Sequence, residues 1–176
     1  DMFLALDNLK EAAEQDHKQA NEILGLIYYY GVDVEIDLDE AYMYLSEVGP
    51  EASPESKTIL GKLYYNGDAV AQNYEEAFKY VSEAAQAKHP EAQAMLSVMY
   101  KKGQGVTQDL DKSYKWMMEA ANKNIEARLL MGMKYESGEG VPVDLQEAYF
   151  YYYWAKDGAY PDKSKIPADN KFDKLI

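Results

Sequence analysis

The chain has 176 residues, 47% of them hydrophobic, which is enough to bury a continuous core as one folded domain. It contains no cysteine, and this excludes disulfides, zinc–thiolate sites, iron–sulfur clusters and cysteine nucleophiles. Its 18 basic and 31 acidic residues give a net charge of −13, which repels polyphosphate and argues against nucleic acid as a partner.

The beginning of the chain carries no targeting or membrane signal that we recognise. Asp1 to Leu4 lack the basic flank and long apolar run of a signal peptide. No apolar stretch approaches the roughly 20 residues that a membrane-spanning helix needs, so we expect no membrane insertion. The numbering begins at an Asp, so a processed product and an excised fragment both stay open, and so does the compartment: cytoplasmic, periplasmic or secreted.

Residues of the same type recur along the chain at spacings of 36, 36 and 35 residues. A repeat held at several independent positions indicates a solenoid of stacked units. The recurring sets are Leu24-Gly25, Leu60-Gly61, Leu96-Ser97 and Met131-Gly132; Gly31, Gly67, Gly103 and Gly138; Asp37, Asn73, Asp109 and Asp144; and Ala41, Ala77, Ser113 and Ala148.

The first predicted element is a lone helix in the segment from Asp7 to Ala20. Its Ala12-Ala13 pair lies 72 residues before Ala84-Ala85, which identifies it as the second helix of an earlier repeat. The chain is therefore expected to start in mid-repeat, with a half repeat over residues 1–17. Four repeats follow, at about residues 18–53, 54–89, 90–124 and 125–158.

Each repeat is predicted to be a pair of helices. The first helices run over residues 18–30, 54–66, 90–102 and 125–137; Pro54 and Pro90 stand at a first helical position, and the recurring glycine ends each helix. The second helices begin at the recurring Asp or Asn, which are good N-caps. Glutamates that resemble capping-box partners follow three residues later, although Lys112 breaks this pattern in the third repeat. These glutamates are Glu40, Glu76 and Glu147.

Small residues are predicted to let the two helices of a repeat approach closely. Gly25, Gly61 and Gly132 serve this purpose on the first helix, as the recurring alanine does on the second. Large apolar residues at i, i+4 spacing are expected to fill the seam. They are Leu24, Tyr28, Leu60, Tyr64, Leu96, Tyr100, Met131 and Tyr135.

The third and fourth repeats read AQAMLSVMYKKGQGVTQDLDKSYKWMMEAANK from Ala92 and ARLLMGMKYESGEGVPVDLQEAYFYYYWAKDG from Ala127. This pattern resembles the Sel-one-like repeat (SLR) family, a relative of the tetratricopeptide repeats, over residues 5–158. The first two repeats depart from it in the loop, where we expect an altered loop shape. The resemblance implies an all-α fold, a right-handed α-solenoid over residues 1–160, followed by a C-terminal tail at residues 161–176. It also implies a concave side lined by the first helices that binds proteins or peptides.

Three motifs resemble reactive or ligand-binding sites, but a structural role is favoured for each. His17 and His89 lie 72 residues apart in equivalent turns and cannot form one active site. The acidic run from Asp33 to Asp39 lacks the glycine and glutamate spacing of a calcium-binding loop. Glycines in the 103–105 and 138–140 loops lack the lysine and hydroxyl of a phosphate loop. We therefore predict no catalytic residues, metal or cofactor.

The analogy with tetratricopeptide repeats places a set of side chains on the concave surface. An apolar and aromatic strip with two lysines could hold a peptide that carries a carboxylate; the alternative is a solvated face with some of these residues packed between repeats. The set is Glu22, Leu26, Tyr29, Lys62, Tyr65, Val98, Lys101, Met133 and Glu136.

The last predicted helix is unusually aromatic. Phe150 and Trp154 stand where earlier repeats have lysine and glutamate, so they would form an exposed apolar patch on a polar face. We expect either that residues 161–176 fold back over this patch as a cap, or that Phe150 and Trp154 bind another repeat, a subunit or a partner.

Together these observations favour a non-enzymatic scaffold or adaptor for protein or peptide segments. The acidic charge serves solubility or a preference for basic partners. The alternatives are a secreted or envelope host-interaction factor that acts through its convex face and, less favoured, a cell-wall-related hydrolase. The oligomeric state is open.

Overall fold

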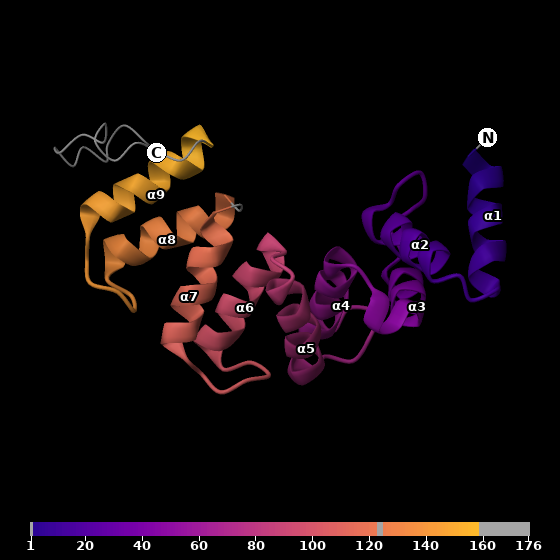
Figure 1. Ribbon diagram of the computed structural model, residues 1–176, viewed down its shortest axis with the longest axis horizontal. Helices are drawn as coiled ribbons and strands as arrows, with labels where there is room; N and C mark the ends of the chain where they lie inside the picture. The colour runs from indigo at the N-terminus through magenta and orange to yellow at the C-terminus, as the bar shows by residue number, and fades with distance from the viewer. Residues whose placement is uncertain (1, 123–124, 159–176) are drawn as a thin grey trace. The chain divides into compact units, whose positions relative to one another are not determined.

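The computed structural model describes residues 2–122 and 125–158, with backbone alone for residues 2–4. Within these residues the regular secondary structure is helical, with no strand: a lone helix is followed by four helical hairpins. Their order along the chain can be followed in Figure 1. The prediction of this order is confirmed. The helices are α1 (Met2–Glu14), α2 (Lys18–Tyr30), α3 (Leu38–Val48), α4 (Pro54–Asn66), α5 (Tyr74–Gln86), α6 (Pro90–Lys102), α7 (Leu110–Ala121), α8 (Ile125–Ser137) and α9 (Leu145–Asp157), with a 3-10 turn at Gly49–Glu51.

The first helix of every hairpin, α2, α4, α6 and α8, has the predicted bounds. Gly31 and Gly67 end α2 and α4 in the left-handed region, at φ 67° and 82°, and their N–H groups donate to the carbonyls of Ile27 and Leu63. Glycine takes this conformation without a Cβ penalty, which explains why it recurs there. The lone helix α1 is different: it ends at Glu14, earlier than predicted, and a turn separates it from Lys18.

The second helices begin at the predicted N-caps, but the capping box is not formed as expected. The Asn73 side chain accepts hydrogen bonds from the N–H groups of Glu75 and Glu76, at 3.0 and 3.1 Å. The Asn73 N–H, which a capping box would direct to the glutamate side chain, donates at 2.9 Å to the carbonyl of Tyr64 in α4. The same bond to a tyrosine carbonyl recurs at Asp37, Asp109 and Asp144 and ties the two helices of each hairpin together.

The chain forms two compact units. The first comprises Asp1–His89 with Gln104–Val106, and the second Pro90–Gly103 with Thr107–Ile176. In the first unit, Leu45, Ile59, Leu60 and Leu63 form a buried cluster.

The crossing of α4 on α5 in the first unit depends on Gly61. A Cβ at this position would lie 2.5 Å from Val81 Cγ2 and 3.4 Å from the Ala77 carbonyl oxygen, and both Val81 and Ala77 are fully buried. The contact with Val81 is shorter than real Cβ atoms show, so any larger residue would force Val81 or the helices to shift. The predicted close crossing is thus present.

The predicted seam tyrosines are half-buried rather than fully buried. Tyr64 stacks on Tyr80 at 5.8 Å between ring centroids, and its hydroxyl lies 2.8 Å from that of Tyr42. In the second unit Tyr135 makes equivalent contacts, to Tyr151 at 5.7 Å and to the Tyr114 hydroxyl at 2.6 Å. The stacked rings thus join the two helices of one hairpin, while the hydroxyl pairs connect each hairpin to the preceding repeat, as expected of an amphipathic side chain.

Candidate binding pocket in the second unit

In the first unit the predicted surface residues mostly make contacts between repeats. Glu22 Oε1 accepts hydrogen bonds from the Ser53 N–H at 2.7 Å and from Ser56 Oγ at 2.6 Å, at the start of α4. Burial alone would raise the pKa of Glu22, but the hydrogen bonds from Ser56 and Ser53 lower it overall. Leu26 and Tyr29 pack against the buried cluster.

The two remaining predicted residues of the first unit are also engaged. Lys62 Nζ lies 5.9 Å from the centroid of the Tyr29 ring, a cation–π arrangement. The Tyr65 hydroxyl donates to Gln104 Oε1 at 2.6 Å, and its ring lies edge-on to Tyr74. The alternative in which some of these residues pack between repeats therefore describes this part of the chain.

In the second unit, four of the predicted residues line one pocket between α6, α7 and α8. Val98 and Lys101 come from α6, and Met133 and Glu136 come from α8. The pocket has a volume of about 420 Å³, within the range of ligand-binding sites. The other lining residues are Ser97, Ser113, Met117, Leu130, Lys134, Ser137 and Glu139.

The residue that the sequence analysis missed is Lys134. In the repeat register it occupies the position of Met99 and Leu63, which are fully buried apolar residues. Lys134 is only 8% exposed as a residue, but its Nζ is not a fully buried atom, and among the residues that the structure describes it forms no hydrogen bond or ion pair. Burial lowers its pKa, nearby Lys101 lowers it further, and Glu139 opposes the shift. Comparing the apolar positions between repeats would have revealed this lysine.

Two further polar residues replace small core residues at the base of the pocket. Ser97 stands where the other repeats have glycine, and Ser113 where they have alanine. Both are fully buried, and Ser97 Oγ donates to the Ser113 carbonyl at 2.7 Å. The hydroxyls lie 3.1 Å apart, so this pair is satisfied and supports the pocket wall.

The acidic residues of the pocket already have partners. Glu139 pairs with Lys101 at 2.6 Å, and the hydrogen bond from Lys101 lowers the pKa of Glu139. The Tyr152 hydroxyl donates to Glu136 at 2.6 Å; burial raises the pKa of Tyr152, and this hydrogen bond raises it further. The pocket thus contains an ion pair, a hydrogen-bonded carboxylate and one lysine without such a partner.

An exposed apolar stripe on α8 leads into the pocket. Ile125, Leu129 and Met133 follow i, i+4 spacing, so they share one helix face, and Leu130 lies beside them. All four are exposed, and Met133, which also lines the pocket, is 56% exposed.

Phe150 and Trp154 are core residues in the part of the chain that the structure describes. They are 3% and 5% exposed and belong to a buried cluster with Met117, Met131 and other residues of α7 and α8. The expected exposed patch is therefore absent here. The cap predicted from residues 161–176 lies outside the described residues.

Arg128 explains much of the environment of Trp154. Its guanidinium lies 4.3 Å from the indole centroid, and its Nε donates to the Ala121 carbonyl at 2.8 Å. In the second repeat the equivalent positions hold the ion pair Lys57–Glu83, at 2.9 Å. The fourth repeat thus exchanges both partners together, replacing an ion pair by a cation–π stack.

The two histidines have separate surroundings in the described part of the chain. His89 Nδ1 lies 2.9 Å from the Thr58 hydroxyl, while His17 precedes α2 without a side-chain cap. No group of three or more histidine or acidic side chains converges as metal ligands among the described residues. Within the same residues, no helix combines the length and apolarity needed to cross a membrane.

Comparison with known proteins identifies the repeat. The profile described as the Sel1 repeat matches residues 18–47, 54–89, 90–124 and 125–157, well over half of the chain. The chain belongs to the Sel1 repeat family. Proteins of this family are in general scaffolds for protein interactions and are typically non-catalytic. A search of curated proteins gives no match.

Solved structures support the same helical-repeat solenoid fold. A protective antigen present in uropathogenic Escherichia coli strains, which has an SLR fold, is 32% identical with a TM-score of 0.75, over 88% of this chain and 33% of that one. A Sel1 repeat protein from Oxalobacter formigenes is 31% identical with a TM-score of 0.79, over 88% and 45%. Helicobacter pylori cysteine-rich protein B, at 22% identity, TM-score 0.53 and 69% and 93% coverage, shares the fold. The chain thus spans less than half of the first two proteins.

Proposed function

We propose that this Sel1 repeat chain is a non-enzymatic scaffold, and that a protein segment docks in the pocket between α6, α7 and α8. The observation that carries the proposal is the open pocket itself, lined by Val98, Lys101, Met133 and Glu136 from two successive repeats. Rigid helices present these side chains, so little ordering is needed when a segment binds.

The surroundings of the pocket favour a peptide over a small polar metabolite. The exposed apolar stripe of Ile125, Leu129 and Met133 extends the contact area beyond the pocket. An apolar surface next to a few polar groups is typical of helix-in-groove or extended-peptide recognition. The net charge of −13 favours a segment that is basic outside the part held in the pocket.

Selection from a random peptide library displayed on phage tests the proposal. We expect peptides to be enriched on the wild-type chain and to lose at least about tenfold in affinity for Met133→Glu, which places a charge in the apolar part of the pocket. Met133 is exposed, so the variant should fold.

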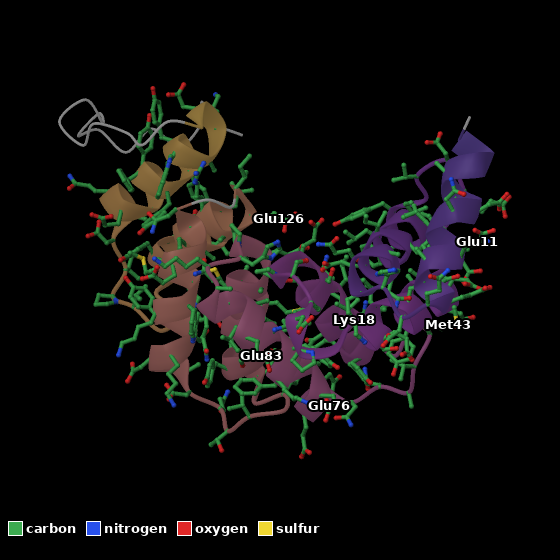
Figure 2. The ribbon with its side chains drawn as sticks, turned by 45° about the vertical axis from the view of Figure 1, so that its right-hand side comes forward. Glu11, Lys18, Met43, Glu76, Glu83 and Glu126 are labelled. Carbon is green, nitrogen blue, oxygen red and sulfur yellow. The ribbon has the colours of Figure 1, made fainter. Side chains whose placement is uncertain are left out.

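Met43→Glu is the matched control. Met43, labelled in Figure 2, is 46% exposed on α3 of the first unit and does not line the pocket. Its substitution should leave peptide affinity unchanged. Failure to enrich any peptide, or equal loss of affinity in both variants, would refute docking in this pocket.

A further inference from the structure

The pocket contains a charge that the repeat fold does not need. The position of Lys134 is filled by methionine in the third repeat and by leucine in the second, where Leu63 packs with Leu26 and Tyr29 in the core of the first unit. Lys134 lines the same pocket as Val98 and Lys101, the repeat equivalents of Leu26 and Tyr29. An apolar residue would satisfy the packing, so the ammonium group requires another explanation.

The neighbouring groups do not neutralise Lys134. Glu139 is the nearest acidic influence on it, but this carboxylate forms its ion pair with Lys101. Glu136 accepts its hydrogen bond from Tyr152. The ammonium nitrogen is not a fully buried atom, so in the open pocket it can be reached by water, and an anion bound there would replace that water with a charge-assisted contact.

We propose that Lys134, assisted by Lys101, receives a single carboxylate of the bound peptide, while apolar groups beside that carboxylate contact Val98, Leu130 and Met133. The carboxylate is either the C-terminal group of the peptide or an Asp or Glu side chain. This inference rests on the proposed function and specifies the chemistry of the segment that binds.

The pocket favours one carboxylate over a phosphate or a run of acidic residues. Glu136 and Glu139 lie in the same pocket, so each additional negative charge would be repelled at short range. The apolar lining also suits an acidic residue with an apolar neighbour better than a hydrated phosphate. The lysine ammonium group is a compact charge that can donate hydrogen bonds to a carboxylate approaching from several directions.

The test compares four blocked peptides on the whole chain. Acetyl-Leu-Asp-Leu-amide and acetyl-Leu-Asn-Leu-amide differ in a side-chain carboxylate, and acetyl-Leu-Gly-Leu and its amide differ in the C-terminal carboxylate. Binding is followed by NMR of the methionine methyl groups, where Met117 and Met133 report on the pocket and Met43 serves as a reference outside it. We expect one acidic peptide to bind at least about tenfold more tightly than its neutral counterpart, and the better pair identifies the carboxylate source.

Variants assign the effect to the ammonium group. Lys134→Met restores the residue type of position 99, so it should fold with an unchanged or higher melting temperature and bind both members of each pair equally weakly. Lys115→Met, an exposed lysine of α7 outside the pocket, should bind as wild type does. Glu139→Gln should bind the acidic peptide more tightly, because it frees Lys101 and removes a competing carboxylate.

Equal affinity for acidic and neutral peptides, or an unchanged preference in Lys134→Met, would overturn the inference. If Lys134→Met does not fold, the side-chain Cε resonance of Lys134 in the wild-type chain gives the answer, since the acidic peptide alone should shift it. Library peptides that bind without a preference for carboxylates would leave the scaffold function standing and refute only this inference. If acidic peptides bind at Lys134 but no library peptide is enriched, the carboxylate site stands and the scaffold function in this pocket is refuted.

Discussion

Gly61 is the position at which the helix crossing of a repeat is tested most directly. We expect Gly61→Leu to destabilise the chain strongly, because the new side chain has no room against Val81 and the Ala77 carbonyl. Replacing glycine in a helix gains about 0.5–1 kcal/mol of backbone entropy, whereas overpacking a core costs about 1–3 kcal/mol or more. For alanine the net loss should be about 1–2 kcal/mol, and for leucine about 3 kcal/mol or more, since three further carbons must be accommodated.

The assay is urea unfolding followed by circular dichroism, with thermal melting in parallel. A loss of about 3 kcal/mol corresponds to a fall of about 6–12 °C in a chain of this length. Gln86→Ala, at an exposed position of α5, is the control and should change stability by less than about 0.5 kcal/mol.

A double-mutant cycle shows whether the loss comes from the contact with Val81. Val81→Ala alone removes two methyl groups and should cost about 1.6 kcal/mol plus a cavity term. When Val81→Ala is combined with Gly61→Ala, the methyl group added at position 61 fills part of the cavity left by Val81. The double variant should therefore be more stable than the sum of the two single losses predicts. An unchanged urea midpoint for Gly61→Leu, or strictly additive losses, would show that Gly61 is not a close crossing.

Three further outcomes are expected. Asn73→Ala should destabilise the chain by about 0.5–2 kcal/mol in urea unfolding, because two N–H groups of α5 lose their cap, whereas Asn73→Asp should be nearly neutral. Glu22→Gln should lower stability at neutral pH but not in acid, as urea unfolding midpoints measured between neutral pH and pH of about 3 would show. The folded-state pKa of Glu22 is depressed, so its stabilisation is present above the unfolded-state pKa and disappears as pH falls through the folded-state pKa. Tyr135 has a raised pKa, chiefly from burial and then from its hydrogen bond to Tyr114. Its contribution to stability should therefore be constant at pH values below the unfolded-state pKa of about 10 and should decrease at higher pH. In a pH series of urea midpoints, Tyr135→Phe should reduce that alkaline loss of stability.

The bounds of the first helix in each hairpin, and the start of the second, could be predicted from sequence because their signals are local. The terminal glycine, the Asp or Asn cap and the proline at a first helical position each act within one turn of the chain. The capping box failed as a prediction for a tertiary reason, because the N–H of Asn73 and its equivalents is taken by a tyrosine carbonyl of the preceding helix. Sequence spacing within one helix contains no information about that partner.

The surface residues were harder to predict because the analogy fixes a position in the repeat but not its neighbours. Glu22 sits at the analogous position, yet it holds the start of α4 through Ser53 and Ser56. Trp154 stands where the second repeat has Glu83, and Arg128, where that repeat has Lys57, stacks on the indole, which also belongs to the buried cluster of the second unit. Such paired exchanges become visible once two positions are known to touch.

Departures from the repeat at core positions offer a better guide to function than the positions that repeat well. A residue that keeps the register serves the packing of the array, since every repeat must bury the same seam. Ser97, Ser113 and Lys134 are polar where the corresponding residues of the other repeats are glycine, alanine or large and apolar, and all three line the same pocket. The serines satisfy each other, so they place polar atoms beside the pocket at little cost, whereas Lys134 leaves a charge without a hydrogen-bonding partner among the described residues. Ser56 is also polar where the other repeats have alanine, but it lies outside the pocket and has a structural role, since its hydroxyl donates to Glu22. Lys134 has no such role among the described residues, so it is the exchange that points to a polar ligand.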